Sequence, residues 1–325
     1  MLDTAPAVRA ARGRPGRRSS GPARPRRHRP WPYLLIAPTL VVIALLMFWP
    51  MIQIAIMSFQ KVGNRQLAGA PAESVGTENY RTVLSDELFW QSLRSTVLFA
   101  VVAVTLTLVL GTLVGLLLNR LGRRMAALVS AGVMVAWATP PITAAIIFTW
   151  LFGTTGGVVN WFLDLLPDAL VGGGWLDHNW FATPLRTYTV LTVCVVWQSF
   201  PFVAVSVLAG LKSLPGELLE AARVDGASAW RAFWTITFPI LRPIFLVLLV
   251  LSIIWDFKVF TQLFIMSGMA NRDAFNLLLY SYSEAFGGMN AKLGLGSAIA
   301  AILTLLLLAV TAVYVRIMVR QGETS

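Results

Sequence analysis

The chain has 325 residues, of which 57% are hydrophobic and only 13% are charged, and its mean hydropathy is +0.71. A water-soluble domain of this composition would have to bury more apolar surface than it could cover, so the composition excludes an ordinary soluble protein and favours a membrane protein. The net charge is +11, but nine arginines lie within residues 1–30, so the excess is local and does not indicate nucleic-acid binding. The single cysteine, Cys194, excludes an intrachain disulfide and indicates no metal cluster.

Residues 1–30 consist mainly of Arg, Pro, Gly, Ala and Ser, with almost nothing apolar to bury. This composition predicts a disordered, Arg/Pro-rich tail. Arg17 and Arg18 are similar to a twin-arginine signal, but the apolar run that follows is long and lacks a small-residue cleavage site. We therefore expect the tail to precede an uncleaved membrane helix that starts translocation.

The rest of the chain, residues 31–320, is predicted to form one transmembrane domain. A bilayer core of about 30 Å requires roughly 20 apolar residues in a helix, and six stretches of the chain meet this length. The predicted fold is therefore an all-α integral membrane protein with six transmembrane helices. The predicted spans are residues 32–58, 93–118, 125–152, 188–211, 240–266 and 293–318.

Three stretches have features that predict local geometry. In the second span, Gly111 and Gly115 have the spacing that lets two helix backbones approach closely. In the third span, Pro140 and Pro141 remove backbone donors and should kink the helix. Residues 78–93 carry apolar side chains at helical spacing, so we expect them to form an amphipathic helix on the membrane surface.

The distribution of Lys and Arg predicts the orientation. With the six spans as above, 18 of these residues lie on the side of both termini and seven lie on the opposite side. Cytoplasmic loops carry the excess of basic residues, so both termini are predicted to be cytoplasmic. Nine of the 15 acidic residues fall in the external loops, which agrees with this orientation.

The predicted cytoplasmic loop at residues 212–239 has the pattern of two short helices joined by a sharp turn. Ser213 can cap a first helix that tolerates Pro215 in its first turn. Gly226 supplies the backbone freedom that ends this helix, and Ser228 can cap the next one. Such a segment, exposed in the cytoplasm, has the shape of a docking element.

The same loop carries a longer motif. It has Glu-Ala-Ala at residues 220–222, then Gly226, Ile236 and Pro239 at fixed spacing, with Phe238 where Leu is usual. This motif resembles the EAA loop of permease subunits of binding-protein-dependent ATP-binding-cassette (ABC) transporters. The resemblance extends over about residues 33–318 and is closest to the carbohydrate-uptake subfamily, which includes the larger permease subunits of maltose-type importers.

The resemblance implies a coupling helix that inserts into a cleft of a separate ATPase subunit. It also implies a multi-pass permease of the bacterial inner membrane, surrounded by lipid, that is not an enzyme and has no cofactor. The implied partners are a second homologous permease, two ATP-binding-cassette ATPase subunits and an extracytoplasmic sugar-binding protein that delivers a sugar substrate. The implied contact residues for the ATPase are Glu220, Ala221, Ala222, Asp225 and Gly226.

Asp256 and Lys258 lie within the apolar run of the fifth predicted span. An ionisable side chain in the membrane is costly unless it faces protein or water, and residues two apart on a helix do not face one another. Each therefore needs a partner elsewhere, and two glutamines are candidates within the chain. One interpretation is a sugar path, and the other is a helix-packing charge network or a charge at the membrane boundary. The candidate path residues are Trp197, Gln198, Trp255, Asp256, Phe257, Lys258, Phe260 and Gln262.

Other functional classes are less well supported. No Gly-rich loop followed by Gly-Lys-Ser/Thr occurs, so hydrolysis of ATP is expected on partner subunits. The two histidines, His28 and His178, are too few and too far apart to indicate a metal site or a proton relay. An ion-driven secondary transporter is a more distant alternative, because it too would have broken helices and midplane charges. An ABC permease for glycerol phosphate or a polyol is a nearer alternative.

Overall fold

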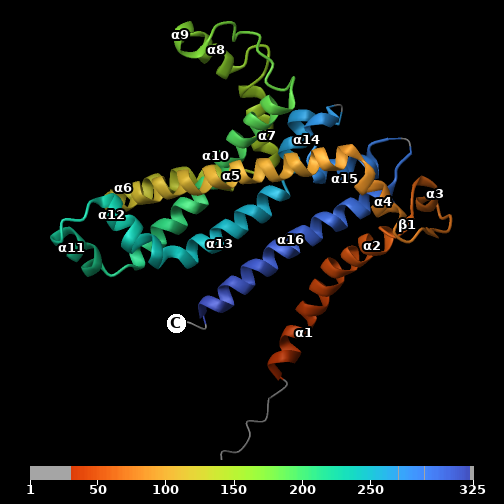
Figure 1. The fold of residues 1–325 in the computed structure, drawn as a ribbon, viewed down its shortest axis with the longest axis horizontal. Coiled ribbons are helices and arrows are strands. Elements are labelled where there is room, and N and C mark those ends of the chain that lie inside the picture. The colour runs from red at the N-terminus through yellow and green to blue at the C-terminus, as the bar shows by residue number, and fades with distance from the viewer. Residues whose placement is uncertain (1–30, 270, 289, 323–325) are drawn as a thin grey trace, which may run out of the picture. The chain divides into compact units, whose positions relative to one another are not determined.

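The computed structural model describes residues 31–269, 271–288 and 290–322 (Figure 1). The predicted tail, residues 1–30, lies outside the described residues. The chain divides between Trp49 and Pro50 into two compact units. In the first unit, helix α1 (Trp31–Ile43) continues into the π-helix η1 (Ala44–Phe48), and α2 (Trp49–Met57) begins at the boundary.

The second unit contains the other helices and one short antiparallel sheet, in which Gln60 pairs with Ser74. Up to residue 171 the elements are β1 (Gln60–Lys61), α3 (Asn64–Leu67), β2 (Glu73–Ser74), α4 (Glu78–Ser85), α5 (Glu87–Arg120), α6 (Arg123–Ala138), α7 (Pro141–Leu151), α8 (Val158–Asp164) and α9 (Asp168–Val171). The remainder are α10 (Pro184–Ser213), α11 (Gly216–Val224), α12 (Ala229–Ala232), η2 (Phe233–Thr237), α13 (Phe238–Phe257), α14 (Thr261–Ser267), η3 (Arg272–Ala274), α15 (Leu277–Phe286) and α16 (Leu293–Gly322).

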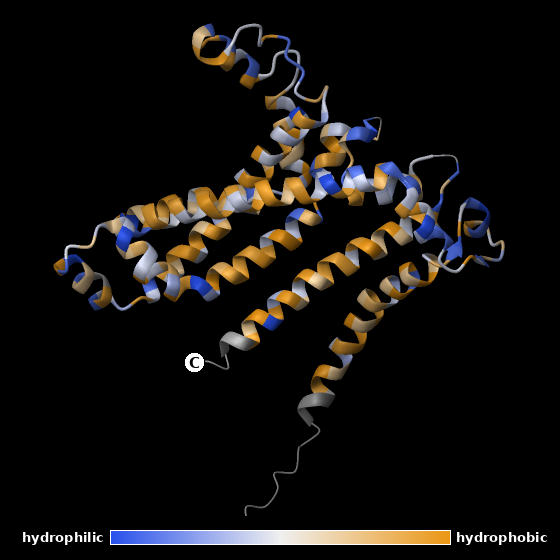
Figure 2. Cartoon of the chain, viewed as in Figure 1, coloured by the Kyte–Doolittle hydropathy of each residue, from blue (hydrophilic) through white to orange (hydrophobic). Residues whose placement is uncertain are grey.

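Five helical segments of the described chain are long and apolar enough to cross a membrane, and α6 with α7 can supply a sixth span. Figure 2 shows that hydrophobic residues dominate these long helices, while hydrophilic residues gather at their ends and in the connections. The prediction of an all-α fold with about six apolar spans is therefore confirmed. The five segments are Leu35–Met57, Glu87–Arg120, Pro184–Ser213, Ala229–Phe257 and Leu293–Val319.

The third predicted span is sharply bent, because α6 and α7 meet at an angle of 93°. Pro140 and Pro141 have no N–H to donate, so the helical hydrogen bonds cannot continue through them. Thr139, which directly follows the last residue of α6, is extended (φ −68°, ψ 126°), and its free carbonyl accepts a hydrogen bond from the side chain of Gln198 at 2.6 Å. The kink predicted at Pro140 and Pro141 is therefore present, as a sharp bend between two helices that together can form one span.

The fifth predicted span, 240–266, has other boundaries. Its helix begins at Ala229, passes through η2 and ends at Phe257. Lys258 and Phe260 leave the helical conformation, and the carbonyl of Val259 between them accepts from Asn276 Nδ2 at 2.5 Å. A partner from another element thus replaces a lost helical bond, which the local sequence could not reveal.

The predicted amphipathic helix over 78–93 is two helices, α4 and α5, that meet at Asp86. The Asp86 side chain accepts from the backbone N–H of Leu88 at 2.9 Å and so caps α5. Asp is a strong N-cap residue, so it starts a new helix where the apolar spacing alone predicts a continuous one. The long helix α5 therefore begins six residues before the predicted span.

Helices α5 and α10 pack closely, and glycine makes this possible. A Cβ atom on Gly111 would lie 2.5 Å from Val203 Cβ, and one on Gly115 would lie 2.8 Å from the Ala204 carbonyl oxygen. The predicted close approach at these glycines is confirmed. The main hydrophobic core gathers around α14 and α15, with Leu263 and Tyr280 fully buried in it. We call this region the α15 end, and the opposite end of α5 and α10 the α11 end.

Candidate functional site

The α11 segment, residues 216–228, joins α10 to the helix that begins at Ala229. Gly226 has φ +76°, the left-handed conformation that glycine tolerates, and it ends α11. Ala227 N–H donates to the Ala222 carbonyl at 2.9 Å, the six-residue closure typical of a glycine-terminated helix. Ser228 Oγ then accepts from the Arg231 N–H at 3.3 Å and caps α12. The predicted turn at Gly226 and the predicted cap at Ser228 are both confirmed.

The start of α11 differs from the prediction. Ser213 belongs to the last turn of α10, and its hydroxyl donates to the Gly210 carbonyl at 2.7 Å. Pro215 occupies the N-cap position of α11 and provides no side-chain hydrogen bond. The prediction that Ser213 caps this helix was wrong, because α10 extends far enough to include it.

Four of the five predicted contact residues of the α11 segment are exposed, namely Glu220, Ala221, Asp225 and Gly226. Ala222 is only 8% exposed, so its side chain is not part of this surface. Two apolar side chains that sequence reasoning missed stand out, because Val224 is 87% exposed and Trp230 is 72% exposed.

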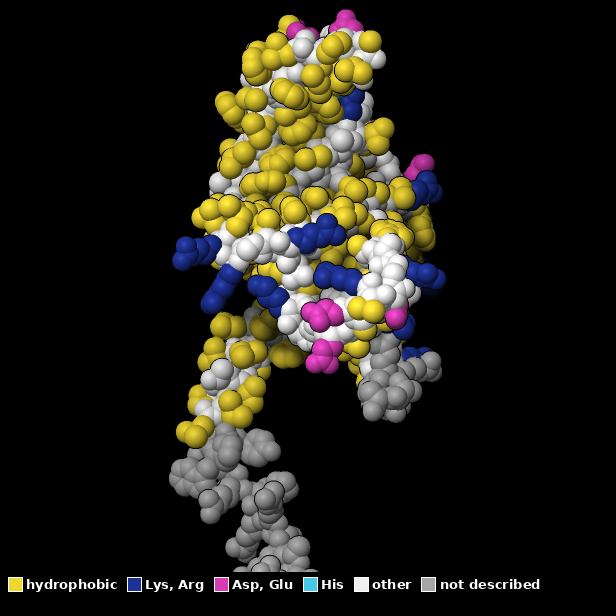
Figure 3. All heavy atoms as spheres, turned by 90° about the vertical axis from the view of Figure 1, so that its left-hand side faces the viewer, with side chains coloured by type: hydrophobic (Ala, Val, Ile, Leu, Met, Phe, Trp, Pro, Cys, Tyr) yellow, Lys and Arg dark blue, Asp and Glu magenta, His cyan; other side chains and the backbone are white. Residues whose placement is uncertain are grey.

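Figure 3 shows the α11 end, where acidic side chains lie amid a surrounding group of Lys and Arg side chains. The acids of α11 are Glu217 and Glu220, and neither forms an ion pair with any described residue. Charged and apolar groups therefore remain available to a partner on this surface. Exposed basic residues lie at or near the ends of the helices of this region, namely α5, α6, α10, α11, α12 and α13. They are Arg120, Arg123, Arg124, Lys212, Arg223, Arg231 and Arg242.

A cavity of about 580 Å³ lies where the two helix breaks meet, at Thr139–Pro141 and at Lys258–Phe260. The structure places Trp197 and Phe257 elsewhere, against the main hydrophobic core. We call the cavity at the two helix breaks the polar cavity. It brings together six of the eight candidate path residues: Gln198, Trp255, Asp256, Lys258, Phe260 and Gln262.

Two glutamines connect the walls of the polar cavity. Gln262 Nε2 donates to Gln198 Oε1 at 3.1 Å, and Gln198 Nε2 donates to the Thr139 carbonyl at 2.6 Å. This chain links α14, α10 and the break between α6 and α7. The two glutamines were the candidate partners of Asp256 and Lys258, but they bond to each other and to the backbone instead.

Asp256 lies in the wall of the polar cavity and is 3% exposed. Its Oδ2 atom has no hydrogen-bond partner among the described residues, and no ion pair joins it to Lys258, whose side chain is exposed. A buried carboxyl oxygen without a partner is costly. Asp256 Oδ2 is therefore free to accept a hydrogen bond from a group outside the described residues.

Aromatic residues that sequence reasoning missed complete this wall. Trp137 stacks on Phe202 with ring centroids 5.7 Å apart, and Phe202 makes an edge contact with Trp255 at 5.4 Å. Trp137 and Trp255 both line the polar cavity. The proline pair was the local signal of this part of the wall, because it marks the break beside Trp137.

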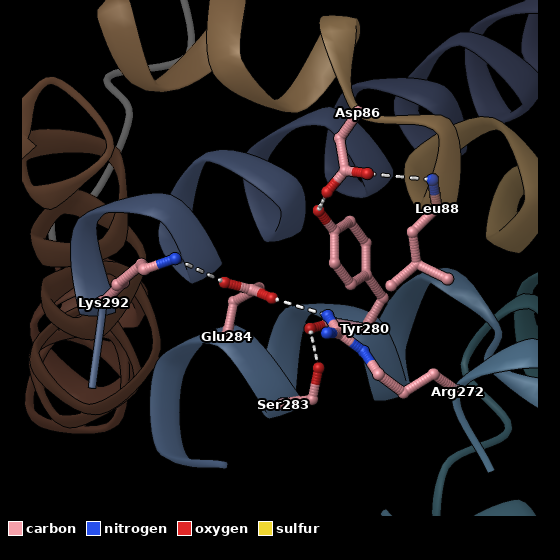
Figure 4. A network of polar contacts seen from close by, with 7 residues as sticks. All are labelled: Asp86, Leu88, Arg272, Tyr280, Ser283, Glu284 and Lys292. Atoms are coloured by element: carbon pink, nitrogen blue, oxygen red, sulfur yellow. Dashed lines mark hydrogen bonds and ion pairs between the residues drawn. The ribbon is translucent and has the colours of Figure 1, made fainter. Parts of the chain in front are cut away.

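The α15 end has a second polar network, shown in Figure 4. Glu284 accepts from Arg272 at 3.0 Å and from Lys292 at 3.4 Å. The Tyr280 hydroxyl donates to Asp86, and burial together with this carboxylate raises the pKa of Tyr280. These contacts join α4, α5, α15 and the start of α16, and sequence reasoning did not predict them.

Comparisons with known proteins agree with this architecture. Residues 107–321 match the family described as binding-protein-dependent transport system inner membrane component. The chain is 40% identical to the diacetylchitobiose uptake system permease protein DasB of Streptomyces coelicolor, over 90% of this chain and 88% of that protein. It is 33% identical to the sulfoquinovosyl glycerol transport system permease protein SmoG of Agrobacterium fabrum, over 87% and 89%.

Among solved structures, the fold is similar to a chain of a bacterial alginate ABC transporter in complex with an alginate pentasaccharide-bound periplasmic protein. The TM-score is 0.72 at 19% identity, over 88% of this chain and 93% of that one. This likeness concerns the fold. With the family match and the two curated relatives, the chain belongs to the family of inner membrane components of binding-protein-dependent transport systems, the multi-pass permeases of ABC transporters.

Proposed function

We propose that this protein is a permease subunit of an ABC sugar importer, in which it forms the translocation path with a second, homologous permease. The observation that carries the proposal is the α11 segment, which is exposed, turns at Gly226 and leads directly into the helix that forms a wall of the polar cavity. In this proposal the segment docks on an ATPase subunit through Glu220, Ala221, Asp225 and Gly226. The exposed Val224 adds apolar contact area.

The proposed orientation places the α11 end and both termini in the cytoplasm. The excess of Lys and Arg on that side supports it. The α15 end then faces outward, where an extracytoplasmic binding protein delivers the substrate. The complex contains two ATPase subunits, because each of the two permeases presents one docking segment.

The proposed substrate class is a sugar. DasB is named for uptake of diacetylchitobiose and SmoG for uptake of sulfoquinovosyl glycerol, and both cover most of this chain. The polar cavity combines the aromatic faces of Trp137 and Trp255 with hydrogen-bonding groups, the pairing of surfaces that a sugar ring and its hydroxyls require. Asp256 Oδ2 would accept from a sugar hydroxyl.

Transport is proposed to follow alternating access. Binding of ATP closes the ATPase subunits on the two docking segments, and the movement passes along the continuous helix from Ala229 to Phe257. The cavity walls move with the end of this helix, so the path opens outward when the ATPases close. Hydrolysis resets the helices.

The experiment is uptake by the full complex, reconstituted in proteoliposomes with the second permease, the ATPases and the binding protein. We expect uptake of radiolabelled disaccharide to require ATP and binding protein, to be abolished by vanadate and to be insensitive to an uncoupler. A matched complex with ATPase subunits that bind but do not hydrolyse ATP serves as the control. Uptake that persists with vanadate and collapses with the uncoupler would show an ion-driven transporter instead.

A further inference from the structure

Asn276 occupies an unusual position at the α15 end. It is 1% exposed, and its side chain uses both ends of the amide. Its Oδ1 accepts from the Leu279 N–H at 2.8 Å and caps α15, while its Nδ2 donates to the Val259 carbonyl at 2.5 Å. Capping requires only the oxygen. The donated bond is a separate contact, made to a carbonyl 17 residues earlier in the chain, between α13 and α14.

The carbonyl that accepts this bond lies at the break after α13. The helix from Ala229 to Phe257 is continuous and carries the α11 segment at its other end. Val259 follows it and lines the polar cavity together with Lys258 and Phe260. The bond from Asn276 therefore holds the end of this long helix at the point where it becomes cavity wall.

Helix α15 is itself fixed to its surroundings by independent contacts. The Leu277 N–H donates to Thr96 on α5 at 3.0 Å, Tyr280 donates to Asp86, and Ser281 Oγ donates to the Gly296 carbonyl on α16 at 2.8 Å. Because these contacts anchor α15 to α5 and α16, a group on α15 that also holds the end of α13 connects a movable helix to a fixed frame.

We propose that Asn276 is a positioning residue that holds the end of the helix at Phe257 against the fixed α15 frame, through its bond to the Val259 carbonyl. Movement of this helix then turns about a fixed point beside the polar cavity. The proposal rests on the proposed function, because it assigns one contact through which ATPase closure reaches the outward side. Without the bond, the end of the long helix is no longer held against α15, and its movement no longer changes the cavity wall in a defined way. Hydrolysis then continues, but the binding protein no longer controls it.

The test uses the full reconstituted complex and two variants that keep a capping oxygen for Leu279. Asn276→Asp has no amide donor, and Asn276→Ser is too short to reach Val259 and carries no charge. We expect each variant to assemble and to retain basal ATP hydrolysis. The ratio of binding-protein-stimulated to basal hydrolysis should fall about fivefold. This is the effect expected when one buried hydrogen bond is lost from one of the two conformations of the transport cycle, inward-open or outward-open.

The matched control is Leu191→Ala on α10, which removes a fully buried side chain from the same core and breaks no hydrogen bond to Val259 or to α15. It should lower the thermal midpoint of the complex and leave the hydrolysis ratio unchanged. A wild-type ratio in Asn276→Ser, or an equal loss of the ratio in Leu191→Ala, would overturn the role of Asn276. A wild-type complex without binding-protein-stimulated hydrolysis would instead overturn the proposed function itself, and the role of Asn276 with it.

Discussion

The two ends of the helix that runs from Ala229 to Phe257 are held in opposite ways. At its start, the α11 segment is exposed, its acids have no ion-pair partners among the described residues, and its shape depends on one glycine and one serine cap. At its end, the chain enters a core in which Asn276 and Thr96 are almost completely buried and hydrogen-bonded.

This difference indicates which end of the helix can bind a partner and which end is held in place. A docking surface needs groups that are not already paired within the chain, and the α11 segment provides them. A frame against which a helix moves needs internal contacts that survive the movement, and α15 provides them. The polar cavity lies beside the second end, where a small displacement of the helix changes its walls.

The largest expected effect comes from the turn of the α11 segment. Gly226→Val should reduce ATP-dependent uptake about tenfold or more, because a β-branched residue at this positive φ costs at least about 1–2 kcal/mol and displaces the segment. A Cβ would meet nothing within 4 Å there, so the effect arises from the backbone and not from a clash. Uptake in proteoliposomes and co-purification of the ATPase measure it.

Gly226→Asn is the control, since Asn tolerates the left-handed conformation and should keep most of the uptake. Normal uptake by Gly226→Val would contradict the docking role. Loss of uptake in both variants would point to a requirement for glycine other than its backbone conformation.

The second expected effect concerns the close packing of α5 against α10. Gly111→Val places a side chain against Val203 and should lower the free energy of unfolding by about 2 kcal/mol or more through overpacking. The thermal midpoint in detergent measures it. Gly132→Ala is the matched control, because the space around Gly132 is open and alanine favours a helix. Equal midpoints for Gly111→Val and wild type would show that α5 and α10 can separate without cost.

The third expected effect concerns the polar cavity. The double variant Asp256→Asn with Lys258→Met should raise the KM for sugar uptake roughly tenfold, as expected for the loss of a hydrogen bond to a charged group, while the complex still assembles. Transport kinetics and size-exclusion chromatography measure the two properties. Altered assembly with unchanged sugar preference and affinity would assign these residues to helix packing instead.

The smallest expected effect comes from His178, whose ring centroid lies 4.8 Å from that of Trp175 and 4.9 Å from that of Trp180. Burial, and secondarily Arg186, lowers the pKa of His178 below its usual value. The folded loop thus favours the neutral imidazole ring of His178. The stability that this preference gives to the loop is fully present above the usual pKa of about 6.5 and is lost as the pH falls below it.

Limited proteolysis of residues 153–183 should therefore be slightly faster at pH 5.5 than at pH 7.5 in the wild type. The rate in a His178→Gln variant, measured in parallel, corrects for the protease's own dependence on pH. Equal pH dependence in the two proteins would show that His178 does not affect this loop.

Local patterns in the sequence predicted much of the fold and part of the candidate site. Gly226 and Ser228 act through the backbone of their own turn, and the apolar spans are defined by length and composition, so neighbouring residues suffice to find them. Gly111 and Gly115 indicated a close helix contact, although their partner helix was not identified. Membership of the ABC permease family followed from the spacing of the α11 motif and is confirmed by the comparisons.

Other features depend on residues that are distant in the chain. The end of α13 depends on Asn276, which supplies the partner for the Val259 carbonyl. The pairing of Gln262 with Gln198, and the exclusion of Trp197 and Phe257 from the polar cavity, depend on how α10, α13 and α14 pack. Sequence by itself determined the membrane class, most of the spans and the turn at Gly226, because these follow from local chemistry. Only the tertiary structure decided where α13 ends and which residues form the polar cavity, because free backbone and side-chain groups are stabilised there by partners that folding brings together.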